Sequence, residues 1–498
     1  MHHDTLLFHL STIIFQEPYI YIDLGTQGTL STTLKEFVLS EIEKQLLNRY
    51  NIDIYTSKFI KGLYSNDIRR FSSGVWGGYK SNNPPLYEEK LCEMLDKKTQ
   101  IKDQYLKDSI GHIAKERKKQ IIISLDNSDQ RDFIIQQDTF IIGHELAKEW
   151  NAAVFLSVRP FTFYKSKQAG AFSAYPSKVF TILPPRIDDL INKRLVFALK
   201  MAEGEIPVIG LKYLNLNTSN ISSFLKALIY SLSHNPDISE LLTNITGGNI
   251  RGVIDVVKGF IGSPNVDAEK IISIMENNGQ YLIPIHEFSK SALLGEYSHF
   301  NPDSSIAYNL FDVTYPDKKE HFLSSIIISF LFKPGSTFDK NLFIENDDIC
   351  KEMQNHGFTP EQVETTLSKL INKRLIENQK RITHEEDDAD IIKQSSSKYR
   401  VTSIGVYHIT KWIYTFSYLD AMVFDTPIFD DTIKDELLKS LESFEITHRF
   451  NRAFLFKKYL LSCWREIPTT PNYFNFEELM VLSDSTFNKV KKYIESNS

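Results

Sequence analysis

An apolar run of strand length ends in an acidic residue at Asp126. The run Ile121–Asp126 is followed by the polar residues Asn-Ser-Asp-Gln. If this strand belongs to a parallel sheet, the Asp126 carboxylate lies at the carboxyl edge, where ligands of such sheets bind. A carboxylate placed there can position Mg²⁺ beside the phosphates of a nucleotide. The same residues also suit an ordinary acidic turn, because Asp and Asn are favoured at strand ends. Residue types alone leave both interpretations open.

Polar and basic residues follow two later breaks in the apolar pattern. Ser157 and Arg159 end a second buried-type run, and Arg251 opens a helix after a Gly-Gly pair. Either arginine suits an ordinary surface or capping position.

The elements that must position these residues alternate between strands and helices in the first part of the chain. The strand-like runs are Pro18–Leu24, Ile121–Asp126, Ala152–Ser157 and Lys178–Leu183. The helix-like segments are Thr5–Ile14, Leu34–Tyr50, Pro85–Leu95, Lys102–Lys119 and Arg131–Trp150, with a polar loop predicted over Ser72–Pro85. Apolar strands separated by helices predict an α/β core with a parallel sheet covered on both faces.

The rest of the chain has helical spacing. Helices are expected from Ile187 to about Glu276, with a break at Thr246–Asn249. Three helices and a two-stranded ribbon then follow in the order of a winged helix: Lys318–Phe332, Asn346–Asn355, Thr359–Arg374, and the strands Leu375–Gln379 and Tyr399–Thr402. We therefore expect an α/β core over 1–185, a helical lid domain over 186–315, a winged-helix domain over 316–425 and a C-terminal helical region over 426–498.

This order of elements resembles the P-loop NTPases of the STAND and AAA+ divisions, including the origin-recognition type. The resemblance covers roughly residues 5–280, and the winged helix continues it to about residue 410. It implies that Asp126 is the Walker B aspartate that positions Mg²⁺ and that Ser157 is the polar sensor-1 residue. It also implies that Arg159 lies near the γ-phosphate and that Arg251 is the sensor-2 arginine of the lid. Asn127 stands where such proteins often keep a catalytic glutamate, which leaves Asp129 as the nearest residue to orient the attacking water.

The phosphate-binding loop is the main departure from this family. A P-loop has the motif G-x-x-x-x-G-K-[ST], whose backbone N–H groups and lysine hold the phosphates, and the 498 residues contain no such motif. The segment Asp4–Leu10 resembles the helix that directly follows a P-loop, and Thr5 falls near the Mg²⁺-binding Ser/Thr. We expect either a start further upstream or the loss of the first strand and its loop. Bound ATP and Mg²⁺ are therefore conditional on an intact phosphate site.

The predicted winged helix carries mixed charge. Its third helix holds Lys369, Lys373 and Arg374 but also two glutamates, and the wing His384–Asp390 contains five carboxylates. Carboxylates at a wing tip repel a phosphate backbone. The sequence therefore favours a protein-contact or lid role for this module over DNA binding.

Composition excludes several classes of protein. The net charge of −6 does not suit a strongly basic nucleic-acid coat protein, and no apolar run approaches the length that spans a bilayer. The three cysteines contain no CxxC pair, which argues against a zinc finger and favours a reducing compartment. No secretory signal pattern is seen, so a cytoplasmic protein without a membrane partner is expected.

Three functions remain in competition. The first is an ATP-dependent switch that hydrolyses ATP slowly and controls contacts of the winged helix and C-terminal helices, with host defence and signalling among the roles of such switches. The second is a catalytically degenerate scaffold that binds a protein partner or a second copy of itself. The third is a relative of DNA-binding initiators and loaders.

Overall fold

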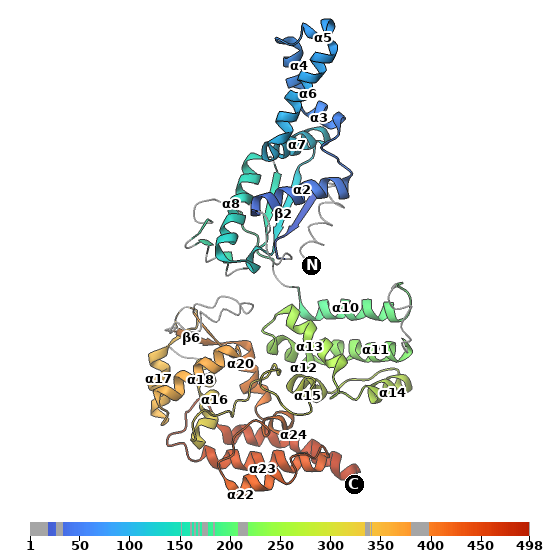
Figure 1. Cartoon of the computed structure of the whole chain (residues 1–498). Coiled ribbons are helices and arrows are strands. Elements are labelled where there is room, and N and C mark those ends of the chain that lie inside the picture. Colours follow the sequence, from blue (N-terminus) through green and yellow to red (C-terminus); the bar gives the residue numbers. More distant parts are fainter. Residues whose placement is uncertain are drawn as a thin grey trace. The chain divides into compact units, whose positions relative to one another are not determined.

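The computed structural model describes most of the chain in two compact units, Met1–Phe180 and Thr181–Ser498 (Figure 1). The residues described are 18–25, 33–150, 152–159, 162–163, 166–167, 170–171, 178–182, 185–207, 218–333, 339, 341–379 and 398–497. The predicted helix Thr5–Ile14, with Thr5 itself, and the acidic wing His384–Asp390 lie outside them.

The first unit is built on the parallel sheet that the sequence predicts. Strands β1 (Tyr19–Asp23), β2 (Ile121–Asp126) and β3 (Ala152–Leu156) lie in the order β1-β2-β3, and both pairs are parallel. The helices of this unit are α2 (Leu34–Tyr50), α3 (Ser57–Leu63), α4 (Ser65–Ser73), α5 (Tyr79–Asn82), α6 (Pro84–Gln100), α7 (Lys102–Arg117) and α8 (Phe133–Glu149). Apolar side chains of α2, α7 and α8 form one buried core with the strands. This places β2, and therefore Asp126, at the centre of the sheet.

The two edges of this sheet differ. On the outer edge of β1, the Tyr50 hydroxyl donates to the Tyr19 carbonyl (2.8 Å), and the Gln45 amide exchanges hydrogen bonds with both backbone groups of Tyr21. On β3, the Ser157 N–H donates to the Leu125 carbonyl. Alternate residues of a strand bond the same neighbouring strand, so the N–H and C=O groups of Val154 point away from β2. No partner for them is found within the described residues. Among the described residues, side chains therefore cap the β1 edge, whereas nothing pairs with the β3 edge.

Replacing Gln45 by alanine should uncover the β1 edge. The variant loses two hydrogen bonds at Tyr21 and leaves a half-buried peptide group without its partner, so we expect a loss of about 1–3 kcal/mol in the free energy of unfolding. Urea denaturation would measure it. Asn48→Ala, at an exposed position of the same helix, is the control; equal stability of the two variants would contradict the capping role.

One predicted strand is wrong for the residues described. Positions 178–182 of the expected strand Lys178–Leu183 form no strand, and Val179, Phe180 and Ile182 are 57%, 75% and 58% exposed. The β-branched and aromatic residues suit a strand, but strand preference has little force without a paired neighbour to bury these side chains. No described strand pairs with this segment.

Between α2 and α7 the chain forms a helical projection, which we call the finger (residues 57–100). It contains α3, α4, α5 and α6, and α4 and α5 lie at its end, away from the sheet (Figure 1). The loop predicted over Ser72–Pro85 is only partly irregular, because it includes α5 and the start of α6. The α6 helix begins at Asn83, whose side chain accepts from the Leu86 N–H, with prolines in the first turn.

The second unit is mostly helical and shares one apolar core. Its first helices are α10 (Ile187–Ala202), α11 (Thr218–His234), α12 (Pro236–Ile245), α13 (Ile250–Gly262), α14 (Ala268–Asn278) and α15 (Ile285–Leu294). The break predicted at Thr246–Asn249 is confirmed. Asn249 starts α13 there by accepting from the N–H groups of Arg251 and Gly252.

A small antiparallel sheet follows in the same unit. The chain passes through η5 (Lys318–Phe322), α16 (Leu323–Phe332), β4 (Ile344–Glu345), α17 (Asn346–Asn355), α18 (Pro360–Asn372), β5 (Ile376–Asn378) and β6 (Lys398–Val401). The sheet has the order β4-β6-β5. The predicted helices and the two-stranded ribbon are confirmed, whereas the two-residue strand β4 is too short to predict. The capping box of Thr359 and Gln362 starts α18 as expected.

The chain ends in further helices, as predicted. They are α20 (Ser403–Tyr407), the π-helical turn η6 (His408–Trp412), α21 (Phe416–Met422), α22 (Asp431–Leu438), α23 (Ile446–Trp464) and α24 (Phe476–Asn497). None of the helices that the structure describes is long and apolar enough to cross a bilayer.

A buried connecting segment at Tyr308–Phe311 is held by side chains from three of these elements. The Tyr308 N–H donates to Nε2 of His408 (3.1 Å), and the Tyr418 hydroxyl donates to the Tyr308 carbonyl (2.6 Å). Nδ1 of His321 bonds the Phe311 carbonyl (2.7 Å). His408 is wholly buried, and its Nδ1 bonds the Ile404 carbonyl, so its neutral form with a proton on Nδ1 satisfies both nitrogens.

Candidate functional site

The Asp126 carboxylate lies at the carboxyl end of the central strand, as the sequence predicts. One of its oxygens, Oδ2, accepts from the Tyr21 hydroxyl of β1 (3.0 Å), and Oδ1 accepts from the N–H of Asn127 (2.9 Å). Asp126 is half-buried. Each oxygen keeps a lone pair beyond these contacts, so the group is oriented without being saturated.

A second carboxylate, Asp23, lies opposite Asp126 in register at the end of β1. Its Oδ1 accepts from the Asn127 amide (2.8 Å) and from the N–H of Gly25 (2.9 Å). Asn127 has a left-handed backbone (φ 58°), a conformation that asparagine tolerates better than most residues. Asp23 was not among the residues predicted from the sequence, although the run Tyr-Ile-Tyr-Ile-Asp carries the same signal of an apolar strand that ends in a carboxylate.

Two further predicted residues meet in an ion pair. Asp129 lies in the short turn after β2 and Arg159 just after β3, and Arg159 Nε is 2.8 Å from Asp129 Oδ2. The Asp129 side chain is only 7% exposed and that of Arg159 is 30% exposed. The structure therefore joins the predicted water-orienting carboxylate to the predicted phosphate-binding arginine.

Ser157 completes the part of the predicted site that lies within the first unit. Ser157 follows β3 directly, and its N–H donates to the Leu125 carbonyl (3.0 Å). Arg251 is exposed in the first turn of α13 and belongs to the other unit. Thr5 lies outside the described residues. The candidate site therefore consists of Asp126, Asp129, Ser157, Arg159 and the newly found Asp23.

The donor set at this edge suits Mg²⁺ better than metals held by a protein cage. Within the described part of the chain, no group of three or more His, Cys, Asp or Glu side chains could hold a metal ion. Mg²⁺ usually takes one or two carboxylates and completes its shell with water and substrate phosphates. Asp126 fits such a partial shell, with Asp23 beside it.

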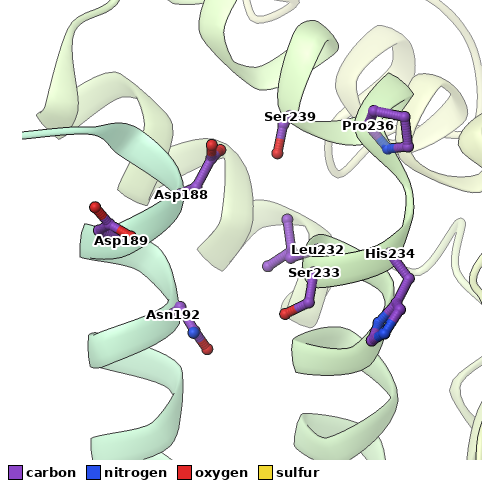
Figure 2. Close-up of a pocket in the computed structure, with 8 residues that line it drawn as sticks. All are labelled: Asp188, Asp189, Asn192, Leu232, Ser233, His234, Pro236 and Ser239. Atoms are coloured by element: carbon purple, nitrogen blue, oxygen red, sulfur yellow. The ribbon is translucent and has the colours of Figure 1, made fainter.

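A separate polar pocket of about 390 Å³ lies in the helical part of the second unit. Figure 2 shows Asp188 and Asn192 on the side of α10 that faces α11, with His234 at the end of α11. The complete lining is Asp188, Asp189, Asn192, Leu232, Ser233, His234, Pro236 and Ser239. None of the site residues predicted from the sequence lines this pocket.

Comparisons of the chain with models of known protein families, with curated proteins and with solved structures found no match.

Proposed function

We propose that the protein is an ATP-dependent molecular switch of the STAND/AAA+ type, which binds ATP–Mg²⁺ at the carboxyl edge of the parallel sheet. The observation that carries this proposal is the Asp126 carboxylate, oriented on the central strand by Tyr21 and Asn127. Ligands of parallel sheets bind at this edge. In this role Asp126 binds Mg²⁺ directly or through water, and Ser157 and Arg159 face the phosphates.

The Asp129–Arg159 pair supports a switching role for the arginine. A γ-phosphate would compete with Asp129 for the same guanidinium group, because both are anions that an arginine binds in a charge-assisted way. When a nucleotide binds, Arg159 would then leave Asp129 and bind the γ-phosphate instead. Because Asp129 lies in the turn after β2 and Arg159 in the segment after β3, these two segments would move together.

The same geometry supports slow hydrolysis as part of the proposal. Asn127 occupies the place of the usual catalytic glutamate, and its amide donates to Asp23. Asp129 is nearly buried against Arg159, which leaves its carboxylate poorly placed to orient water while that pair persists. We therefore expect nucleotide binding, rather than rapid turnover, to set the state of the switch.

The main requirement for ATP binding at this edge is a phosphate-binding loop. A P-loop connects a strand to a helix, and the outer edge of β3 is a place in the described sheet that could accept another strand. ATP binding with useful affinity requires that a segment with backbone N–H donors and a cation reach this edge. We include such a segment in the proposed nucleotide site.

The helices and small sheet of the second unit support a winged-helix module with a protein-binding role. The order α16, β4, α17, α18, β5, β6 is the one expected of a winged helix. In α18, Lys369 forms an ion pair with Asp312 (2.7 Å), and Nζ of Lys373 donates to the Pro302 carbonyl. These cations are engaged inside the unit, which favours contact with a protein or a second copy over DNA reading by this helix.

Titration with ATP tests the proposal. We expect isothermal titration calorimetry to show ATP binding that strengthens with Mg²⁺, and Asp126→Ala to weaken the Mg²⁺-dependent part at least tenfold, or about 1.4 kcal/mol. Asp138→Ala, an exposed carboxylate on α8, should bind as the parent does. Unchanged affinity in Asp126→Ala would contradict the assignment of this residue.

A scaffold without nucleotide chemistry is the second candidate. It is favoured by the absence of a P-loop motif from the 498 residues and by Asn127 in place of a glutamate. In that case the chain shows no ATP binding at millimolar nucleotide, with or without Mg²⁺. The same titration therefore distinguishes the two candidates.

A further inference from the structure

The end of the finger carries a row of aromatic rings. Tyr87 is buried and its ring lies 5.4 Å from that of Phe71; Phe71 stacks on Trp76 at 6.4 Å, and Trp76 lies 5.5 Å from Tyr79. The Tyr87 hydroxyl also hydrogen-bonds Ser72 Oγ (2.7 Å). Tyr79, the last ring, is 42% exposed. The row of rings therefore extends from the buried ring of Tyr87 to the exposed ring of Tyr79.

The loop that presents these rings is tightly closed. A Cβ added at Gly77 would collide with the Ser72 carbonyl, so only glycine fits this approach. The N–H of Gly77 donates to the Gly74 carbonyl (2.9 Å). Val75 lies between them and is 87% exposed. The tip of the finger, residues 69–80, is thus a tightly packed loop that exposes one apolar side chain next to the row of rings.

Three exposed cations lie on α4 and α5, at the end of the finger. They are Arg69, Arg70 and Lys80. Among the described residues, no hydrogen bond or ion pair holds their side chains. Asp67, the nearby acid on α4, is already paired with Lys98 (3.0 Å). Glu88 and Glu89 follow Tyr87 on α6 and are also exposed, so the tip carries three cations against two acids, in a chain whose net charge is −6.

From this arrangement we infer that the finger tip binds single-stranded nucleic acid. Proteins that bind unpaired strands combine cations that contact the backbone with aromatic rings on which bases stack. Arg69, Arg70 and Lys80 supply the first, and Tyr79 with Trp76 supplies the second. Duplex DNA hides the base faces that such rings need. A lipid surface would gain little from one exposed valine, and its binding would depend on charge alone.

Fluorescence anisotropy with a labelled oligothymidylate tests the inference on the full chain. We expect binding at low salt, with a slope of log K against log salt of about −2 for three phosphate contacts to a single strand. The charge reversals R69E, R70E and K80E together should abolish it, and Tyr79→Ala should weaken it about tenfold. Duplex DNA of the same sequence should bind more weakly.

The matched control reverses three other exposed cations of the finger: K58E, K61E and K97E. It changes the net charge by the same amount but leaves the tip intact, so it should retain binding. Circular dichroism checks that both triple variants fold. Equal loss in both variants, no binding at low salt, or binding to vesicles of anionic lipid but not to the oligonucleotide would overturn the inference. Because no ATP is added, and because the triple variant changes only residues of the finger, the result does not depend on ATP binding at the sheet edge.

Discussion

Replacing Arg159 by alanine should destabilise the α/β unit by about 2–3 kcal/mol. The change leaves the nearly buried Asp129 carboxylate without the guanidinium that compensates its charge, and breaking such a pair from one side is costly. The partial exposure of Arg159 places the expected loss below that of a fully buried pair. Urea denaturation of the variant and the parent would measure the difference.

A double-mutant cycle separates structure from function at this pair. The variant with Asp129→Asn and Arg159→Ala removes both charges, so its stability should recover most of what Arg159→Ala loses. If Arg159 also contacts phosphate, the double variant stays stable yet binds ATP more weakly than Asp129→Asn alone. Additive losses of stability in the cycle would contradict the proposed pairing.

Acidification should remove about 3 kcal/mol of stability through His408. Burial lowers the pKa of this imidazole to about 4, whereas in the unfolded chain it titrates near its ordinary value of about 6.5. Between these pH values the unfolded state binds a proton that the folded state does not. The free energy of unfolding therefore falls as the pH drops from about 6.5 to about 4, by up to about 1.4 kcal/mol per unit.

His408→Gln isolates this contribution. Glutamine offers an acceptor for the Tyr308 N–H but does not titrate. The variant should therefore show a flatter dependence of unfolding free energy on pH, while His321, whose pKa is also lowered by burial, still titrates in both proteins. Parallel curves for the parent and the variant between pH 6.5 and 4 would contradict the role of His408.

The sequence predicts the elements of the site better than their contacts. The runs that form β2 and β3 are almost wholly apolar, so a buried strand is the simplest structure for them, and Asp126 follows as an edge residue. The pair of Asp129 and Arg159 is not predictable in this way, because it depends on how two loops thirty residues apart meet in space. The hydrogen bond from Tyr21 to Asp126 is not predictable for the same reason.

The errors also have physical causes. The segment Lys178–Leu183 has the composition of a strand, but pairing decides whether a strand forms, and pairing is not visible in composition. Within the finger, only the helix Pro85–Leu95 and the loop Ser72–Pro85 were predicted. Its ring row arises because Gly77 lets the loop close on Ser72, which brings Trp76 over Phe71.

Hydrogen exchange with and without ATP–Mg²⁺ tests the central claim, the nucleotide site at the carboxyl edge of the sheet, most directly. The claim predicts slower exchange in 126–131 and 157–159, the segments that follow β2 and β3, and no such slowing in Asp126→Ala. Unchanged exchange in both segments at saturating ATP–Mg²⁺, or slowing confined to other parts of the chain, would contradict the claim.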